Sequence, residues 1–240
     1  MARLFVPAEK LQGTHATLDA AAHRHLVKVL RLGPGDMIVI FDGGGMEIEA
    51  RIETVGKASL EIALGDRRHI PAPACAVTLL QSLPRGQRMD LIVQKTTEIG
   101  VARIVPVLSK RGMVKPTAHQ RRRWQTIAEE AARQSERADV PEIHDCIALG
   151  PALVEAATMA GSRFVLWENE RGNSLSSALA GAPRSVVLLV GPEGGFDREE
   201  VALAVEAGFA SVGLGPRILR VETAAIVAVA LAQASAGGLG

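Results

Sequence analysis

The stretch Ser185-Val-Val-Leu-Leu-Val190 runs directly into Gly191-Pro-Glu-Gly-Gly-Phe196, and this apolar run followed by glycines indicates the fold of the chain. A second, shorter run, 211–214, leads into Gly215-Pro-Arg-Ile-Leu-Arg-Val-Glu-Thr-Ala-Ala225. Loops at the carboxyl ends of parallel strands bind ligands in α/β proteins, and glycines let a ligand approach the main chain closely. The two loops together therefore predict a ligand site in the last third of the chain.

Strands and helices alternate through the second part of the chain, from residue 73 onward. The apolar and helical patterns predict strands at 76–80, 103–108, 163–167 and 185–190, and helices at 88–99, 117–138, from 197 onward and at 222–236. This alternation is typical of a parallel sheet covered by helices. The spacing of the elements alone favours an open, doubly wound sheet.

The first part of the chain is mainly β in pattern. We expect strands at 3–6, 37–41, 46–52 and 59–64, a hairpin loop at 42–45, and one helix at about 19–32. Short strands with a single helix suggest a small β-barrel. Two prolines in the segment 69–74 make a stiff connector, so the sequence predicts domains at 1–72 and 73–240.

Charge is unevenly distributed along a nearly neutral chain. The formal net charge is +1, but residues 84–137 carry a balance of +7 and residues 138–240 a balance of −6. A central basic segment is compatible with a surface for a polyanion such as RNA. The alternative is that these charges lie on solvated helix faces, and charge alone favours that alternative.

The remaining bulk features predict a cytoplasmic protein with reduced thiols. Neither Cys75 nor Cys146 has metal-ligand spacing around it, and the six histidines form no ligand pattern, so we predict no metal. The chain shows no signal-peptide pattern, and its longest apolar run, 224–231, is far too short to span a bilayer, so no membrane partner is expected.

The two glycine loops, 191–195 and 215–225, together resemble the signature of the SPOUT class of S-adenosylmethionine-dependent RNA methyltransferases. Within that class the chain is similar to the RsmE family, which methylates N3 of a uridine in 16S ribosomal RNA. The resemblance implies a PUA-like RNA-binding barrel over 1–72. It also implies a SPOUT methyltransferase domain over 73–240, with a trefoil knot, cofactor binding and pairing of two copies into a homodimer.

The resemblance also implies which residues hold S-adenosyl-L-methionine. In the family the cofactor lies bent in loops that follow three strands. Apolar residues within a polar loop also suit a flat adenine ring. The matching candidates here are Leu166, Glu168, Gly191, Pro192, Glu193, Gly194, Gly195, Leu214, Gly215, Ile218, Leu219 and Thr223.

Arginines and one carboxylate are the candidates for catalysis. Methylation of a uracil N3 requires loss of the N3 proton and stabilisation of negative charge on the ring carbonyls, for which Arg is suited. The candidates are Arg217 or Arg220 of the last loop and Arg3 or Arg31 of the first domain. Glu222 is the carboxylate near the loop. Its alternative role is to interact with the dipole at the start of the last helix.

Candidate RNA contacts lie in the first domain and in the central basic segment. His25, Lys28 and Arg31 are spaced by three, which places them on one face of the expected helix, and the family has a His-x-x-x-Val-Leu-Arg element there. The alternative is a solvated stripe on a core helix. Arg3 matches an Arg-x-Phe start in the family, and Arg133 and Arg137 lie in a basic helix that resembles one in the family.

Other functional classes find less support in the sequence. The loop at 191–195 is neither G-x-G-x-x-G nor a P-loop, which disfavours a nucleotide-dependent oxidoreductase. The chain departs from the expected family pattern at Gly112, where a Ser is expected after Arg111. The sequence therefore predicts an enzyme, an rRNA (uridine-N3-)-methyltransferase acting on the small ribosomal subunit. The alternative is a non-catalytic RNA-binding or ribosome-assembly factor with the same fold.

Overall fold

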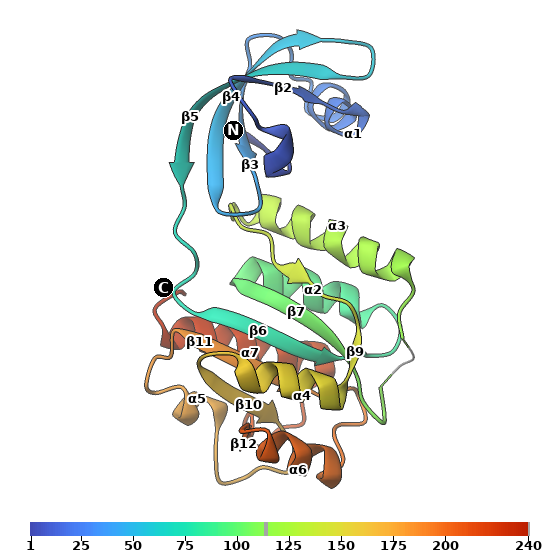
Figure 1. Cartoon of the computed structure of the whole chain (residues 1–240), viewed down its shortest axis with the longest axis vertical. Helices are drawn as coiled ribbons and strands as arrows, with labels where there is room; N and C mark the ends of the chain where they lie inside the picture. The colour runs from blue at the N-terminus through green and yellow to red at the C-terminus, as the bar shows by residue number, and fades with distance from the viewer. Residues whose placement is uncertain (113–114, 240) are drawn as a thin grey trace. The chain divides into compact units, whose positions relative to one another are not determined.

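The computed structural model describes residues 1–112 and 115–239, and the chain forms two compact units (Figure 1). Unit 1 comprises Met1–Ala72 and Ala132–Val140, and unit 2 comprises Pro73–Ala131 and Pro141–Gly240. The first segment of unit 1 ends at residue 72, which is the position where the sequence predicts a boundary between domains. The segment 132–140 differs from the expected division, because the end of a long helix in the second half of the chain packs within unit 1.

Unit 1 is built on a five-stranded sheet in the order β1-β3-β4-β5-β2. The strands are β1 (Ala2–Phe5), β2 (His15–Leu18), β3 (Met37–Phe41), β4 (Met46–Val55) and β5 (Leu60–His69). β1 pairs parallel with β3, and the other pairs are antiparallel. The expected hairpin between β3 and β4 is confirmed. The core of the unit is aliphatic, with Leu26, Ile38, Ile40, Ile52 and Ile62 fully buried.

The helical segment of unit 1 is shorter than expected. It consists of α1 (Ala20–His23), which begins after the N-cap Asp19, and a π-helical stretch, η2 (Arg24–Val29). The amide of Leu30 donates to the carbonyl of His25, five residues earlier. Arg31 follows with a φ of 59°, outside the helix. The prediction that Arg31 shares a helical face with His25 and Lys28 is therefore wrong, because the chain leaves the helix before it.

The end of α3 (Ala118–Gln134) contributes to the core of unit 1. Ala132 and Ala138 are buried against Phe41. The helix was expected to reach residue 138, but it stops at Gln134. Glu136 adopts a φ of 59°, and the amide of Arg137 donates to the carbonyl of Ala132 at 2.9 Å, which closes the helix end.

Unit 2 contains a seven-stranded sheet in which every pairing is parallel. The order is β12-β10-β11-β6-β7-β8, and β9 also pairs with β7. The strands are β6 (Ala76–Ser82), β7 (Val101–Leu108), β8 (Glu142–Ile143), β9 (Ile147–Ala148), β10 (Ser162–Leu166), β11 (Ser185–Val190) and β12 (Ala210–Val212). The predicted parallel sheet is confirmed, and all its strands end at the same edge.

Helices cover both faces of this sheet. One face packs against α4 (Leu149–Thr158) and α6 (Arg198–Glu206), around Leu80, Val187 and Leu189. α7 (Val221–Ser235) packs against β6, β11, α2 (Arg88–Ile99) and the short α5 (Leu175–Ala178). Capping boxes open α6 and α3, with reciprocal bonds between Asp197 and Glu200 and between Thr117 and Gln120. Trp124 of α3 is buried.

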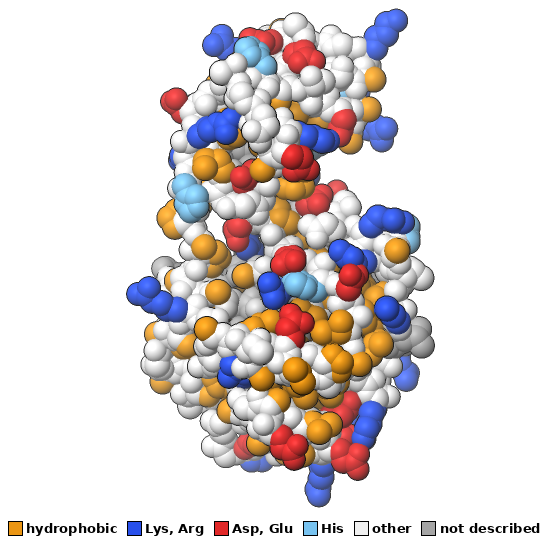
Figure 2. Space-filling view, in the orientation of Figure 1, with side chains coloured by type: hydrophobic (Ala, Val, Ile, Leu, Met, Phe, Trp, Pro, Cys, Tyr) orange, Lys and Arg blue, Asp and Glu red, His pale blue; other side chains and the backbone are white. Residues whose placement is uncertain are grey.

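The surface gives few further constraints on function. Hydrophobic side chains reach the surface of unit 2 on the face shown in Figure 2, and Val154 of α4 and Leu203 of α6 are among the exposed apolar residues of that unit. Both cysteines are buried and unpaired, and burial raises the pKa of each thiol. Within residues 1–112 and 115–239, no helix combines the length and apolarity needed to cross a membrane.

Candidate functional site

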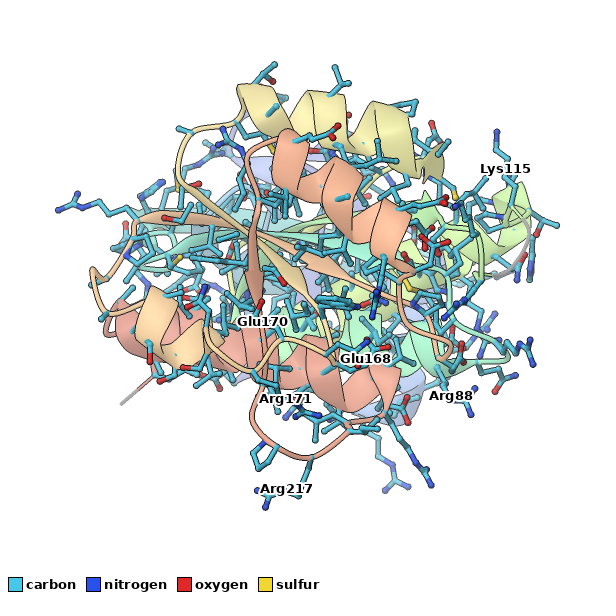
Figure 3. All side chains as sticks on the ribbon, turned by 90° about the horizontal axis from the view of Figure 1, so that it is seen from below. Arg88, Lys115, Glu168, Glu170, Arg171 and Arg217 are labelled. Carbon is cyan, nitrogen blue, oxygen red and sulfur yellow. The ribbon has the colours of Figure 1, made fainter. Side chains whose placement is uncertain are left out.

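A cavity of about 620 Å³ opens in unit 2 where β10, β11 and β12 end. Its wall is formed by the loops that follow these three strands and by the first turn of α7. In Figure 3, Glu168 and Arg171 come from the loop after β10, Arg217 from the loop after β12, and Arg88 from the start of α2. This volume is within the usual range for small-molecule sites.

The cavity brings together most of the residues that the sequence indicated for the cofactor and for catalysis. Three predicted residues are exceptions: Thr223 is exposed and does not line the cavity, and the catalytic candidates Arg3 and Arg31 belong to unit 1. The predicted residues that line it are Leu166, Glu168, Gly191, Pro192, Glu193, Gly194, Gly195, Leu214, Gly215, Arg217, Ile218, Leu219, Arg220 and Glu222. Sequence reasoning missed further lining residues, among them Arg88, Trp167, Arg171 and Gly213.

Two glycines give the cavity wall its open backbone. Gly215 has a φ of 98°, and a Cβ placed on it would meet no atom within 4 Å. Gly195 has a φ of 65°, and a Cβ there would lie 2.4 Å from Oε1 of Glu168. The first position leaves the main chain accessible to a ligand, and the second lets the Glu168 carboxylate lie directly against the loop.

The loop after β7 forms hydrogen bonds and an ion pair with the glycine loop 191–195 and with the start of α6, outside the cavity. Arg111 Nη1 donates to the carbonyl of Gly194 at 2.7 Å, and the amide of Lys110 donates to Glu200 Oε1 at 2.8 Å. Lys110 Nζ also lies 3.0 Å from a carboxylate oxygen of Asp197. The pKa of Asp197 is lowered, first by the backbone N–H of Glu200 and then by Lys110. These contacts fix the position at which the glycine loop becomes α6.

The loop after β10 is held against the end of β12. Glu170 accepts from the amide of Gly172 at 2.9 Å, and this bond lowers the pKa of the Glu170 carboxyl. The amide of Gly213 donates to the carbonyl of Asn173 at 2.8 Å, and the amide of Leu175 donates back to the carbonyl of Gly213 at 3.0 Å. Two of the three cavity loops therefore share backbone hydrogen bonds.

Three arginines of the cavity have no hydrogen-bond or ion-pair partner among the described residues. Arg171, Arg217 and Arg220 are exposed, and no described residue forms a hydrogen bond or ion pair with their side chains. Glu222 lies in the first turn of α7, where a carboxylate interacts favourably with the helix dipole. Its Oε2 is buried, and no described group donates a hydrogen bond to it. The three arginines are free to meet an anionic or hydrogen-bonding ligand, whereas Glu222 Oε2 lies 3.6 Å from Nε of Arg88.

Arg3, in contrast, is engaged within unit 1. Its Nη1 lies 2.5 Å from Glu47 Oε1, and its Nη2 donates to the carbonyls of Glu136 and Arg137 at 3.2 Å each. The guanidinium also lies 5.3 Å from the centre of the Phe41 ring. Burial opposes ionisation of Glu47, yet hydrogen bonds from Arg68 and Arg3 hold the pKa of that carboxyl below its usual value.

The other candidate RNA contacts also lie in unit 1. Arg133 Nη1 donates to His25 Nε2 at 2.7 Å, and Arg137 Nη2 lies 2.5 Å from Asp139. Lys28 and Arg31 are exposed. Their role in RNA binding stays a prediction. Among the described residues, no group of three His, Cys, Asp or Glu side chains could hold a metal ion.

Two family models match the chain. The model of an RNA methyltransferase domain matches residues 71–233, and the model of an RNA methyltransferase PUA domain matches residues 18–64. The first match covers more than half of the chain and includes every residue that lines the cavity.

Curated relatives agree with these matches. The chain is 34% identical over 232 residues to the ribosomal RNA small subunit methyltransferase E of Synechocystis, which covers 95% of this chain and 76% of the relative. It is 29% identical over 245 residues to the protein of the same name from Bacillus subtilis, covering 95% and 94%.

Solved structures show the same fold. A ribosomal RNA small subunit methyltransferase E from Neisseria gonorrhoeae, bound to S-adenosyl methionine, is 35% identical with a TM-score of 0.86 and covers 98% of this chain and 97% of its own. A methyltransferase from Legionella pneumophila, in complex with the same cofactor, is 31% identical with a TM-score of 0.83 and covers the same shares. The cavity, the two family models and these relatives together show that the chain belongs to the ribosomal RNA small subunit methyltransferase E family.

Proposed function

We propose that this protein uses S-adenosyl-L-methionine to methylate N3 of a specific uridine in the 16S rRNA of the small ribosomal subunit. The observation that carries the proposal is the cavity formed by the three loops, whose lining combines glycine backbone with arginines that have no hydrogen-bond or ion-pair partner among the described residues. The relatives that bind the cofactor have this fold over nearly the whole chain.

The residues of the cavity fit the cofactor. Its wall combines aliphatic side chains, suited to an adenine ring, with accessible main-chain groups beside Gly191 and Gly215. Glu168 supplies a carboxylate able to accept hydrogen bonds from ribose hydroxyls. When bound, the cofactor supplies an electrophilic methyl group. Leu166, Leu214 and Leu219 are the residues we expect to hold its apolar part.

The protein's own contribution to the reaction is positioning and electrostatic stabilisation. A neutral imide nitrogen has no useful lone pair, so the N3 proton must leave before or during attack. Arg217 and Arg220 are free to donate to the ring carbonyls on which negative charge then develops. Glu222, whose buried Oε2 receives no hydrogen bond from a described group, is the carboxylate that we propose to orient the uracil or accept a proton.

RNA recognition is proposed for unit 1, as a PUA-like barrel, together with the basic segment of 84–137. The candidate contacts there are His25, Lys28, Arg31, Arg133 and Arg137, with Arg3 as a further candidate. Neutralised phosphates make RNA affinity fall steeply as salt rises. Uracil N3 lies on the pairing edge of the base, so the target must be unpaired or flipped out.

We propose further that unit 2 carries a trefoil knot and forms a homodimer in the cytoplasm. The chain leaves β12 at one edge of the sheet and then packs α7 against β6 and β11, near the middle of the sheet. Ile226, Val227 and Leu231 of α7 are only half-buried within one copy, which is compatible with packing against a second. Light scattering of the purified protein measures the oligomeric state.

The decisive experiment treats small ribosomal subunits from cells that lack this protein with the purified enzyme and labelled cofactor. We expect label in 16S rRNA and one new reverse-transcription stop at a uridine, because an N3 methyl group blocks base pairing. Label without such a stop would contradict the N3 assignment. RNA binding with no calorimetric signal for S-adenosylmethionine would instead favour the non-catalytic assembly factor.

A further inference from the structure

Arg88 connects two parts of the cavity wall that are distant in the sequence. It is the first residue of α2, and its Nη1 donates to Glu193 Oε1 at 2.7 Å. Its Nε lies 3.6 Å from Glu222 Oε2. Glu193 is the central residue of the glycine loop 191–195, and Glu222 is in the first turn of α7. One guanidinium therefore links the glycine loop and the last helix.

The Glu193 side chain anchors the glycine loop to the connection between β6 and α2. Its Oε1 accepts from Arg88 and also from the backbone amide of Arg85, at 2.8 Å. β6 is the direct neighbour of β11, so the two segments that follow these strands leave the sheet side by side. The position of the loop thus depends on a carboxylate and on donors from outside the loop.

Glu222 depends on Arg88 in a different way. Its side chain is 13% exposed, and its Oε2 has no hydrogen-bond donor among the described groups. The Nε of Arg88 is the cationic group beside that oxygen, at ion-pair distance. A carboxylate this buried is costly without a cation, so removal of Arg88 would leave the Glu222 side chain displaced toward solvent.

We propose that Arg88 is a positioning residue for methyl transfer, an inference that rests on the function proposed above. Through Glu193 it holds the glycine loop 191–195 in the shape that receives the cofactor, and through its ion pair with Glu222 it keeps that carboxylate in place in the cavity wall. A guanidinium serves both carboxylates because its donors form a rigid fork. The single ammonium of Lys serves one of them well and the other poorly.

The same helix offers a matched control. Lys95 of α2 forms an ion pair with Glu98 at 2.9 Å, and its side chain is 41% exposed, against 43% for Arg88. Neither Lys95 nor Glu98 lines the cavity. If ion pairs on α2 merely stabilised the helix, substitutions of Lys95 and Arg88 would have the same consequences.

The first measurement is calorimetric titration of S-adenosylmethionine into the full chain. We expect Arg88→Ala to weaken binding about tenfold, because a hydrogen bond to a charged group is lost. Arg88→Lys should fall between that variant and wild type, and Lys95→Ala should stay within about twofold of wild type. Amide hydrogen exchange in residues 191–195, measured without cofactor, should be faster in Arg88→Ala.

The second measurement separates the two contacts of Arg88. Glu193→Gln should raise KM for the cofactor but keep the single-turnover rate at saturating cofactor, whereas Arg88→Ala should lower both affinity and rate. Glu222→Gln should lower the rate with little effect on cofactor affinity. The double variant Arg88→Ala/Glu193→Gln should bind the cofactor no more weakly than Arg88→Ala, because the two changes remove one interaction.

Wild-type cofactor affinity and exchange in Arg88→Ala would overturn the proposal, as would equal effects of Arg88→Ala and Lys95→Ala or additive losses in the double variant. Should Arg88→Ala fail to fold, wild-type affinity and rate in Arg88→Lys would overturn it equally. Failure of the proposed function would give a different experimental result from failure of the Arg88 proposal. A wild-type protein that binds the cofactor but modifies no rRNA would end that proposal, while titration and exchange would still test Arg88.

Discussion

Arg3 in unit 1 and Arg220 in unit 2 were both candidates for stabilising the imide anion, and their surroundings are opposite. The Arg3 guanidinium contacts a buried carboxylate, two carbonyls and an aromatic ring, and the side chain is only 11% exposed. Arg220 is exposed at the N-cap of α7, and its side chain forms no cap hydrogen bond. The first contributes to folding, whereas the second is available for a ligand.

Residue type and motif are therefore insufficient to distinguish a structural arginine from a functional one. What distinguishes them is whether the guanidinium already has partners within the fold: both terminal nitrogens of Arg3 do, although its buried Nε donates to no described group. Removal of an arginine that has partners within the fold should lower the stability of the protein. Removal of an arginine without such partners should lower the rate of the reaction. The following experiments test this difference between structural and functional arginines, and the site and ion pair connected with it.

The largest expected effect is on stability, in Arg3→Ala. The substitution leaves Glu47, which is 4% exposed, with Arg68 as its remaining ion-pair partner, and it removes the hydrogen bonds from Arg3 to two carbonyls beyond the end of α3. We expect the free energy of unfolding to fall by about 3 kcal/mol. Urea denaturation followed by circular dichroism measures it. A variant of normal stability with a reduced methylation rate would reverse the assignment.

Arg220→Ala should have a large effect on rate and almost none on stability. Loss of one donor to a developing oxyanion lowers the rate by about a hundredfold. The Arg220 side chain forms no hydrogen bond or ion pair with a described residue, so the urea midpoint should stay at the wild-type value. Single-turnover methylation, with cofactor affinity measured in parallel, tests this. A near-normal rate would remove Arg220 from the mechanism and leave Arg217 as the candidate in this loop.

Gly195→Ala tests whether the close approach of Glu168 matters to the site. A Cβ would lie 2.4 Å from Glu168 Oε1 and push the carboxylate away, so we expect cofactor affinity to fall about fivefold. Gly86→Ala is the control, because Gly86 has the same φ of 65° and a Cβ there meets nothing within 4 Å. Both variants should lose about 1 kcal/mol of stability. Equal cofactor affinities in the two would show that Glu168 is not a ligand.

The smallest effect is a pH dependence of stability that belongs to unit 1. Because the pKa of Glu47 is lowered in the folded state, its contribution is fully present above its usual value of 4.5 and disappears as the pH falls through the lowered folded value. The stability difference between wild type and Glu47→Gln should therefore shrink in acid. A difference that is constant between pH 7 and pH 3 would contradict the ion-pair interpretation of Arg3.

Much of unit 2 could be predicted because its elements are marked locally. The strand at 185–190, the helix at 88–99 and the helix from 197 onward were expected and are present, and local signals mark them: the capping box of Asp197 and Glu200, and Gly100 at the end of α2. α4 escaped prediction because Gly150 and Pro151 mark a break in the sequence, although proline is tolerated in a first helical turn. α3 ends without a glycine, since Glu136 itself adopts the positive φ, so its end was placed too late.

The cavity loops were also predictable, because each follows a strand directly, but the residues around them were not. Arg88 follows β6, and only the strand order shows that β6 lies beside β11. The partners of Arg3 lie at the end of α3, more than a hundred residues away along the chain. A single sequence carries no record of such distant contacts, so it cannot show which arginines are already occupied.

The nine residues 132–140 make unit 1 unsuited to transfer as a simple cassette. A fragment that stops at residue 72 would lack the two alanines that cover Phe41 and the carbonyls that receive Arg3. Gene fusions that exchange only the first 72 residues between relatives would therefore pair a borrowed strand with a host helix end that did not evolve with it. We expect these two segments to change together among the relatives of this protein.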